Sequence, residues 1–254
     1  MPKQISELRI IPVPVQKEIR PGDCLPELLL SAMRHQKLKL IKGDILVVKH
    51  KIVSKAEGQL VDLDTVKPSA SSRAWARRYH LDARVIETAI AQSKRIVRRN
   101  RGVLITETQH GFVCANSGVD VSNVDGGRNA LLLPKAPDRS AAQLHRELKK
   151  CLKISIPVII SDSFGRPWRE GQTEVAIGVA GMAALHDYRG QRDAHGYKLK
   201  ASLEAVADEL ACAAGLVCGK LEGTPVCIVR GFHFQPGRGV ARDLIRSAAN
   251  DLFR

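Results

Sequence analysis

Aromatic side chains are scarce in this chain of 254 residues, since Phe, Trp and Tyr together make up 4% of it. Proteins that bind single-stranded nucleic acid commonly stack the bases on aromatic rings. So few rings disfavour that class of protein, and we do not expect nucleic acid as a partner.

Long apolar runs are also missing. The longest apolar stretches, around residues 154–160 and 211–217, fall well short of the roughly 20 residues that cross a bilayer. The first residues, MPKQISELRIIPVPV, contain neither the apolar core nor the small-residue cleavage site of a secretory signal. We therefore expect no membrane partner and a cytoplasmic location.

The cysteines do not form the CxxC pairs that are typical of zinc sites. They lie far apart, so we expect no zinc and reduced thiols that are mostly packed in the interior. The six are Cys24, Cys114, Cys151, Cys212, Cys218 and Cys227.

Basic residues exceed acidic ones, with 40 Lys and Arg against 26 Asp and Glu, a formal net charge of +14. With 44% hydrophobic and 26% charged residues the composition is that of an ordinary globular protein. The positive surplus attracts polyanions, either nucleic acid or a small phosphorylated ligand, and the charge alone does not choose between them. The length fits a single unit over residues 1–254, or two interlocked subdomains within it.

Apolar patterning predicts several strands and helices. Strands are expected over residues 8–15, 45–48, 103–105, 111–116, 156–160, 175–180 and 224–229. Helices are expected from residue 25 to 32, over 69–99 with a break near Asp82, over 141–152 with Asp138 or Ser140 as N-cap, and over 202–217. This mixture predicts the α+β class.

The predicted helix over residues 69–99 carries a basic exposed face. Such a run is most simply a solvated surface, although a non-catalytic nucleic-acid-binding protein is a remote alternative. The face consists of Arg73, Arg77, Arg78, Lys94, Arg95, Arg98 and Arg99.

Two aspartates stand out on polar segments. Asp120 lies in GVDVSN, and Asp162 directly follows the most apolar strand. Carboxylates held rigidly at such places can bind Mg²⁺ or Mn²⁺ and leave positions for water and phosphate. Each could equally cap its loop by accepting bonds from nearby backbone amides, and spacing alone does not decide between the two.

The segment GRPWREGQT carries Arg166 and Arg169 close together, bordered by glycine and stiffened by proline. Guanidinium groups in such a loop suit the bidentate binding of carboxylate or phosphate, so we expect both arginines to contact an anionic ligand and, with Asp162, to be the catalytic residues. For Trp168, between them, core packing is the simpler expectation.

A further basic group follows the strand over 45–48, with Lys49, Lys51 and Lys55. The segment GKLEGTP, with Gly219, Lys220, Gly223 and Thr224, resembles a turn that cradles phosphate, although the Walker A pattern is absent. A glycine helix cap followed by lysine explains Gly219 and Lys220 equally well.

Taken together, these segments resemble the coenzyme F-420-0:L-glutamate ligase family in its single-domain form. They occur in order from about Arg20 to Arg254, so the resemblance covers nearly the whole chain. The matching stretches are GDILVVKHKIVSKAEG, HGFVCANSGVDVSNV, LLPKAPDRSA, VIISDSFGRPWREGQTEVAIGVAG, DYRGQRDAHG, AVADELACAAGLVCGKLEGTPV and LIRSAANDLFR.

The resemblance implies that L-glutamate is added to F-420-0 by a gamma-glutamyl amide bond, with GTP consumed through an acyl phosphate. It also implies Mn²⁺ or Mg²⁺, a monovalent cation as a further expectation, and a homodimer with an intertwined mixed fold. Carried over by residue, Asp120, Asp162 and Ser163 match metal ligands. The matches to nucleotide-binding positions are Lys55, Asn123, and Gly219, Lys220, Gly223 and Thr224 within residues 218–225.

The chain departs from the family pattern at a few positions. The nucleotide-loop segment reads Val15-Gln16-Lys17-Glu18-Ile19 and keeps only the acidic residue of the usual Gly-Leu-Pro-Glu. His50 and Cys24 replace a small hydroxyl residue and an aspartate, and Ser163 replaces threonine but keeps a hydroxyl ligand. These departures leave open a divergent amide ligase with another acid acceptor or another nucleotide.

Overall fold

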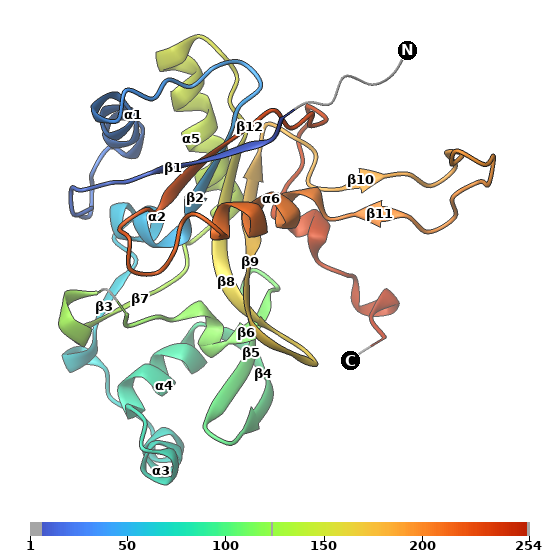
Figure 1. The fold of residues 1–254 in the computed structure, drawn as a ribbon. Coiled ribbons are helices and arrows are strands. Elements are labelled where there is room, and N and C mark those ends of the chain that lie inside the picture. The colour runs from blue at the N-terminus through green and yellow to red at the C-terminus, as the bar shows by residue number, and fades with distance from the viewer. Residues whose placement is uncertain (1–6, 123, 253–254) are drawn as a thin grey trace.

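The computed structural model describes residues 7–122 and 124–252, and a five-stranded mixed sheet forms its centre (Figure 1). The strands lie in the order β1-β12-β2-β8-β9, where β2 and β8 are parallel and the other neighbours antiparallel. Their bounds are β1 Arg9–Val13, β2 Ile45–Lys49, β8 Val158–Arg166, β9 Arg169–Ala180 and β12 Val226–Arg230.

Helices cover both faces of this sheet because its strands are apolar on both sides. In β2, Leu46 and Val48 pack toward helices α1 (Leu25–His35) and α5 (Pro137–Leu152), while Ile45 and Val47 pack toward α6 (Val206–Gly215). The core is therefore two apolar layers separated by the sheet.

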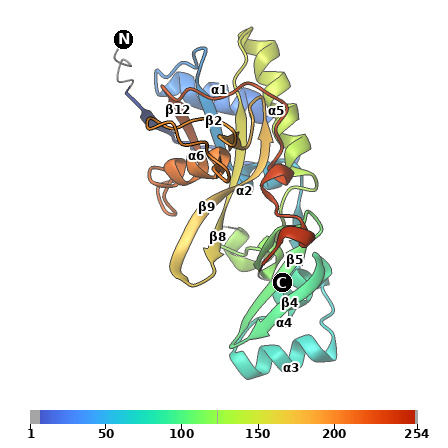
Figure 2. The same cartoon turned by 90° about the vertical axis from the view of Figure 1, so that its right-hand side faces the viewer.

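A second group of elements lies beyond the end of β2, below the sheet in Figure 1. It has its own small core around Leu63, Ala89 and Leu104. Figure 2 shows the β8–β9 hairpin curving out of the sheet toward it, where Phe164 of β8 meets Phe112 edge to face with ring centroids 6.2 Å apart. The elements are β3 Leu60–Asp62, α3 Ala70–Tyr79, α4 Ala83–Ala91, β4 Ser93–Asn100, β5 Val103–Thr108, β6 Val113–Ala115 and β7 Asn129–Leu131. Helix α2 (His50–Ala56) precedes this group and packs Ile52 and Val53 into the core beside α1 and α5.

A long arm leaves the body between β9 and α6 and carries the short pair β10 (His186–Asp187) and β11 (Leu203–Glu204) (Figure 1). Short 3₁₀ turns complete the described part of the chain. They cover Leu63–Thr65, Asn116–Gly118, Asp125–Gly127, Ala241–Leu244 and Ala248–Asn250.

The predicted α+β class is confirmed, and the strands expected near residues 8–15, 45–48, 103–105, 111–116, 156–160, 175–180 and 224–229 are all present. The helix predicted over 202–217 is shorter, because residues 203–204 form β11 instead. The N-cap prediction for residues 138 and 140 is wrong, since α5 begins at Pro137 after Ala136. Asp138 instead accepts hydrogen bonds from the amides of Val179 and Ala241.

The helix predicted over residues 69–99 is wrong at its end. The break near Asp82 is present, and Asp82 caps α4, but residues 93–100 form strand β4. Pairing with β5 overrides helical propensity there. Across the two strands, Glu107 of β5 forms ion pairs with Arg95 Nε at 2.7 Å and with Lys94 Nζ at 3.4 Å. Arg95, Arg98 and Arg99 therefore share no helix face with the arginines of α3.

The segment predicted as a loop after residue 160 is a pair of long strands. The β8–β9 ladder continues from Val158↔Ala180 to Arg166↔Arg169, so Asp162 lies within a strand and Arg166 and Arg169 lie at the hairpin tip. Core packing of Trp168 is also wrong, because its exposed fraction is 81% at that tip. Of the cysteines, Cys114, Cys218 and Cys227 are buried and the other three are exposed, so the expectation of packed thiols holds for half of them.

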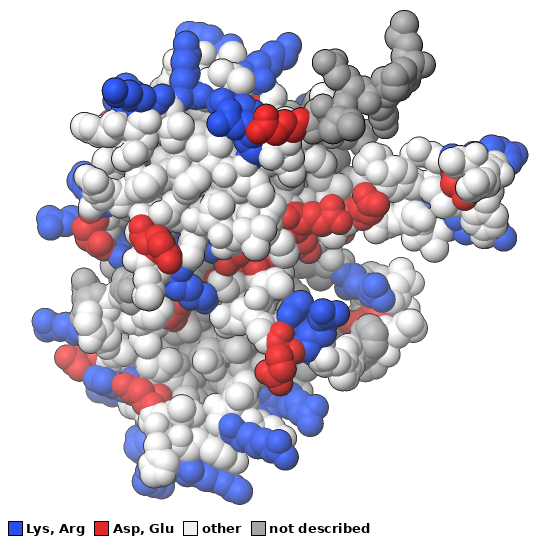
Figure 3. All heavy atoms as spheres, in the orientation of Figure 1, with Lys and Arg blue, Asp and Glu red and all other residues white. Residues whose placement is uncertain are grey.

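Charge is distributed unevenly over the molecule. On the face in Figure 3, Lys and Arg occupy mostly the upper and lower ends, with Asp and Glu between them. Within residues 7–122 and 124–252, no helix combines the length and the apolar character that crossing a membrane requires.

Candidate active site

The first cavity opens where β2 stops. β2 ends at Lys49 and the chain turns at once into α2, whereas the parallel neighbour β8 pairs with it up to Ser161 and then runs on alone on that side. The space left beyond the end of β2 is a cavity of about 410 Å³. Its walls come from the 15–19 segment, α2, the Asp120 loop, β8, β9 and residues 218–225.

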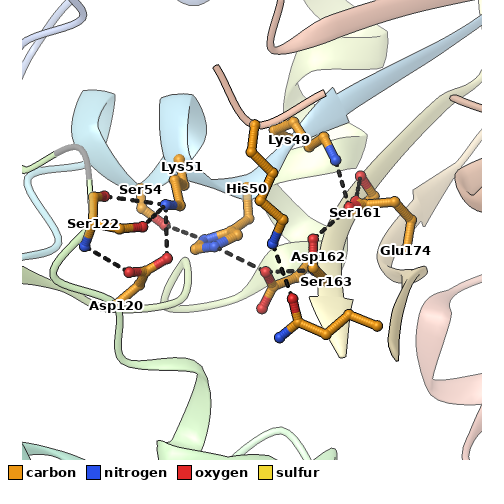
Figure 4. Close-up of polar contacts among 12 residues, drawn as sticks. Lys49, His50, Lys51, Ser54, Asp120, Ser122, Ser161, Asp162, Ser163 and Glu174 are labelled. Atoms are coloured by element: carbon orange, nitrogen blue, oxygen red, sulfur yellow. Dashed lines mark hydrogen bonds and ion pairs between the residues drawn. The ribbon is translucent and has the colours of Figure 1, made fainter. Parts of the chain in front are cut away.

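Asp162 is the first residue of β8 beyond the end of β2, and its carboxylate faces the cavity. Its Oδ1 accepts a hydrogen bond from its neighbour's amide, Ser163 N, at 2.7 Å. The same oxygen lies 3.3 Å from Nε2 of His50, whose Nδ1 lies 3.3 Å from Ser54 Oγ (Figure 4). His50 is 2% exposed, so a buried imidazole between α2 and β8 fixes the position of this carboxylate.

Asp120 enters the cavity from the opposite side. Its Oδ2 lies 2.7 Å from Lys51 Nζ and its Oδ1 accepts a bond from Ser122 N at 2.7 Å (Figure 4). Burial raises the pKa of Asp120, but the bonds from Lys51 and Ser122 outweigh burial and hold that pKa below its usual value. The carboxylate is therefore ionised at neutral pH.

A buried acidic group lies on the other side of Asp162. Glu174 of β9 is 8% exposed at its side chain and binds Lys49 Nζ at 2.5 Å through Oε1. Ser163 Oγ donates to the same oxygen at 2.5 Å, and Ser161 Oγ donates to Oε2 at 2.9 Å (Figure 4). This set of bonds satisfies a carboxylate that burial would otherwise penalise strongly.

Two further lysines border the cavity. Lys55 follows Lys51 by one helical turn, so both point from α2 to the same side, and its Nζ lies 2.5 Å from Glu18 Oε1. Lys220 donates to Gln172 Oε1 at 3.0 Å. Gly223 has a φ of +61°, which favours glycine in the turn that carries Lys220 past the cavity.

The structure brings most of the predicted site residues to this single cavity. They are Asp120, Asp162, Ser163, Lys55, Gly219, Lys220, Gly223 and Thr224. Asn123 lies outside the described residues. Arg166 and Arg169 do not line the cavity, because the strands that carry them extend beyond it, and Arg166 Nη2 donates to the carbonyl of Glu170 within the hairpin at 2.6 Å.

Sequence reasoning missed Glu174 and Ser161, and it noted His50 only as a departure from the family pattern. The available signal for Glu174 was a lone acidic residue at the start of an apolar strand, in TEVAIGVA. Its partner Lys49 on β2 lies far away in the sequence, and its partners Ser161 and Ser163 face it only through the pairing of β8 with β9, so only strand pairing identifies them.

The donors in the cavity fit a hard divalent cation. Asp120, Asp162 and Ser163, the predicted metal ligands, supply two carboxylates and a hydroxyl, which suit Mg²⁺ or Mn²⁺. The described residues contain no group of three or more His, Cys, Asp and Glu arranged to hold a metal. Two carboxylates and a hydroxyl are fewer than the six oxygen ligands that Mg²⁺ takes, so a cation held by them would keep positions for water and phosphate oxygens.

Known proteins share this sequence over nearly its full length. Residues 15–231 match the family described as F420-0:Gamma-glutamyl ligase. The chain is 44% identical to the coenzyme F420:L-glutamate ligase of Methanopyrus kandleri, over 98% of this chain and 99% of that protein. It is 43% identical to the protein of that name from Methanothermobacter thermautotrophicus, over 92% of this chain and 93% of the other. It is 45% identical to the protein of that name from Methanocaldococcus jannaschii, over 84% of this chain and 85% of the other.

The expected resemblance is thereby confirmed on the scale of the whole chain. A family match over 217 of 254 residues, with relatives above 40% identity, is far more than a shared motif. The chain belongs to the F420-0:gamma-glutamyl ligase family.

Proposed function

We propose that this protein adds L-glutamate to coenzyme F420-0 by a gamma-glutamyl amide bond, with GTP and a divalent metal. The terminal phosphate of GTP passes to a carboxylate of F420-0, and the amino nitrogen of glutamate then attacks the acyl carbon and displaces phosphate. The observation that carries the proposal is the first cavity, where two aspartates, a hydroxyl and several lysines from six segments meet.

The charges of the cavity suit a nucleotide triphosphate. Five lysines (Lys17, Lys49, Lys51, Lys55 and Lys220) line it against three carboxylates (Glu18, Asp120 and Asp162). Phosphoryl transfer depends mainly on positioning and on neutralising charge, and lysine ammonium groups do both without covalent chemistry. Asp120, Asp162 and Ser163 would hold Mn²⁺ or Mg²⁺, which when bound neutralises charge on the phosphate oxygens.

Incubation with F420-0, L-glutamate, GTP and Mn²⁺ is expected to give a product heavier by one glutamyl unit, together with GDP. Mass spectrometry measures the first and nucleotide chromatography the second. Excess EDTA should stop both, and added Mn²⁺ should restore them. A folded protein that gives no glutamylated product under these conditions would contradict the proposal.

A second candidate is an amide ligase of the same fold that uses another nucleotide or another acid. It is favoured by the place of the altered segment, because Val15, Lys17, Glu18 and Ile19 all line the first cavity. The pairing of Glu18 with Lys55 makes that segment part of the wall against which a nucleotide would lie. Measuring the Tm of the protein with GTP, ATP, CTP and UTP distinguishes the two candidate functions as to the nucleotide. The proposed function predicts the largest rise in Tm with GTP.

We also expect a homodimer, as the family resemblance implies. The arm that carries β10 and β11 supports this, because it extends away from the body and exposes Tyr197 by 59% and Leu203 by 44% (Figure 1). Light scattering during gel filtration should give twice the chain mass of 27.8 kDa. A variant shortened between residues 189 and 199 is expected to give the mass of one chain, and a full-length chain that elutes as a monomer at assay concentrations would contradict the expectation.

A further inference from the structure

A second cavity of about 320 Å³ lies against the first. Five residues border both, namely Lys49, Ser163, Gln172, Gly219 and Lys220. The second cavity is completed by Thr173 and Glu174 of β9 and by Cys212, Gly215 and Leu216 at the end of α6. The two spaces are therefore neighbouring chambers of a single site that share a wall.

The shared wall lies beside the atoms that the proposed chemistry needs. Ser163 borders both chambers, and the adjacent Asp162 lines the first. An amine that displaces phosphate from an acyl phosphate must approach the carbon next to the transferred phosphoryl group. A substrate held in the second chamber would meet an acyl phosphate formed beside Ser163 across this shared wall.

The size of the second chamber suits a small ligand. Its volume equals that of about ten water molecules at roughly 30 Å³ each. Glutamate has ten non-hydrogen atoms, so the chamber is large enough for this amino acid. The side chain of Glu174 packs directly against Gly215. A Cβ at that position would lie 2.7 Å from Glu174 Cγ, so only glycine leaves room for Glu174 in the wall of the chamber.

The charges of the second chamber suit an anionic amino acid. The lining contains two lysines, Lys49 and Lys220, and one carboxylate, Glu174, so its net charge is +1. L-glutamate carries a net charge of −1 at neutral pH. Glu174 already neutralises Lys49. Lys220 bonds to the neutral amide of Gln172 and has no acidic partner within the part of the chain that the structure describes, so its charge is left for a ligand.

Arg166 adds positive charge nearby. Burial, Asp208 and Glu174 raise the pKa of the Cys212 thiol, and Arg166 opposes them, so the guanidinium lies close enough to act on a residue of this chamber. The side chain lines neither cavity, so Arg166 adds positive charge near the second chamber without being part of its wall.

We infer that the second chamber is the subsite for the attacking amino acid, with Lys220 binding a carboxylate of L-glutamate on the wall shared with the nucleotide chamber. Lys220 borders both chambers, and this role takes the place of the nucleotide contact that the family resemblance implies for it. The inference rests on the proposed function. It assigns the two chambers separate substrates, because nucleotide and metal belong to the first and the amino acid to the second.

Two exposed leucines allow a matched test. Leu216, 82% exposed, lines only the second chamber, and Leu221, 92% exposed, lines only the first. Both project into solvent, so Leu216→Glu and Leu221→Glu add the same charge without disturbing the core. A like charge in a partly solvated site should weaken an anionic ligand about fivefold. Leu216→Glu should therefore raise KM for L-glutamate about fivefold and leave KM for GTP within twofold, and Leu221→Glu should do the reverse.

Binding without turnover separates this inference from the proposed function. Saturation-transfer NMR of L-glutamate with the wild-type chain and both variants reports binding directly. If the wild-type protein gives no glutamylated product but L-glutamate binds it and Leu216→Glu weakens that binding, the subsite stands and the assigned acceptor is wrong. If turnover occurs and Leu216→Glu leaves KM for L-glutamate unchanged, or changes both KM values equally, the inference is overturned and the ligase function stands.

Discussion

Replacement of Asp162 by asparagine is expected to lower kcat/KM for glutamylation by about 10³-fold or more. The substitution keeps the size of the side chain but removes the charge that faces the first cavity beside Ser163 and His50. Charge stabilisation by a metal site contributes several kcal/mol to a transition state, and about 4 kcal/mol corresponds to a factor of ~10³. Steady-state kinetics with saturating GTP and F420-0 measures the loss.

The control is Asp64→Asn, which removes a carboxylate that is 64% exposed and pairs with Arg84 away from the cavity. We expect wild-type kinetics from it, because exposed ion pairs contribute little. Titration of Mn²⁺ followed by electron paramagnetic resonance should show weaker binding to Asp162→Asn than to either the wild type or Asp64→Asn. An Asp162→Asn protein with unchanged circular dichroism and a kcat/KM within tenfold of wild type would contradict the assignment of Asp162 to the metal.

Replacement of Asp44 by alanine is expected to lower the free energy of unfolding by about 3 kcal/mol. Asp44 is fully buried and accepts two bonds from Arg230, from Nε at 2.7 Å and from Nη2 at 2.8 Å, as well as one from the amide of Ile41. Removing one partner of a buried pair leaves the other charge uncompensated, which costs about 3 to 5 kcal/mol. Arg230 is partly exposed, so the lower end of that range applies. Urea unfolding measures the change.

The matched comparison is Asp64→Ala, which breaks an exposed pair and should cost less than about 1 kcal/mol. The double variant Asp44→Ala with Arg230→Met should regain part of the loss, because it removes the unpaired guanidinium. If Asp44→Ala lowers the free energy of unfolding by less than about 1 kcal/mol, the ion pair between Asp44 before β2 and Arg230 at the end of β12 does not stabilise the fold as expected.

Local sequence predicted this fold well where apolar patterning is strong. The strand over residues 45–48 and the helices around Leu29 and Leu210 are continuous apolar or amphipathic segments, and each is present, although the helix around Leu210 is shorter than predicted. The prediction failed at residues 93–100, where arginines and lysine resemble a charged helix face. There the pairing of β4 with β5 decides the structure, and a sequence window does not contain its partner strand.

The candidate site divides in the same way. Asp120, Asp162, Ser163, Lys55 and the 219–224 turn could be predicted because their segments match the family in order. Arg166 and Arg169 were placed in a loop beside Asp162, but the β8–β9 ladder carries them away from the first cavity. Glu174 was missed, since a single acidic residue at the start of an apolar strand has no local pattern.

The sequence by itself determined the family, the α+β class and the supply of oxygen donors and lysines for an anionic ligand. Only the tertiary structure decided where these groups meet. The reason is that β2 stops at Lys49 while its parallel neighbour β8 continues. Asp162 and Ser163 therefore have no strand beside them on the β2 side, and they border the first cavity there. Strand pairing joins residues more than a hundred positions apart, and the two chambers beside Ser163 exist only through that pairing.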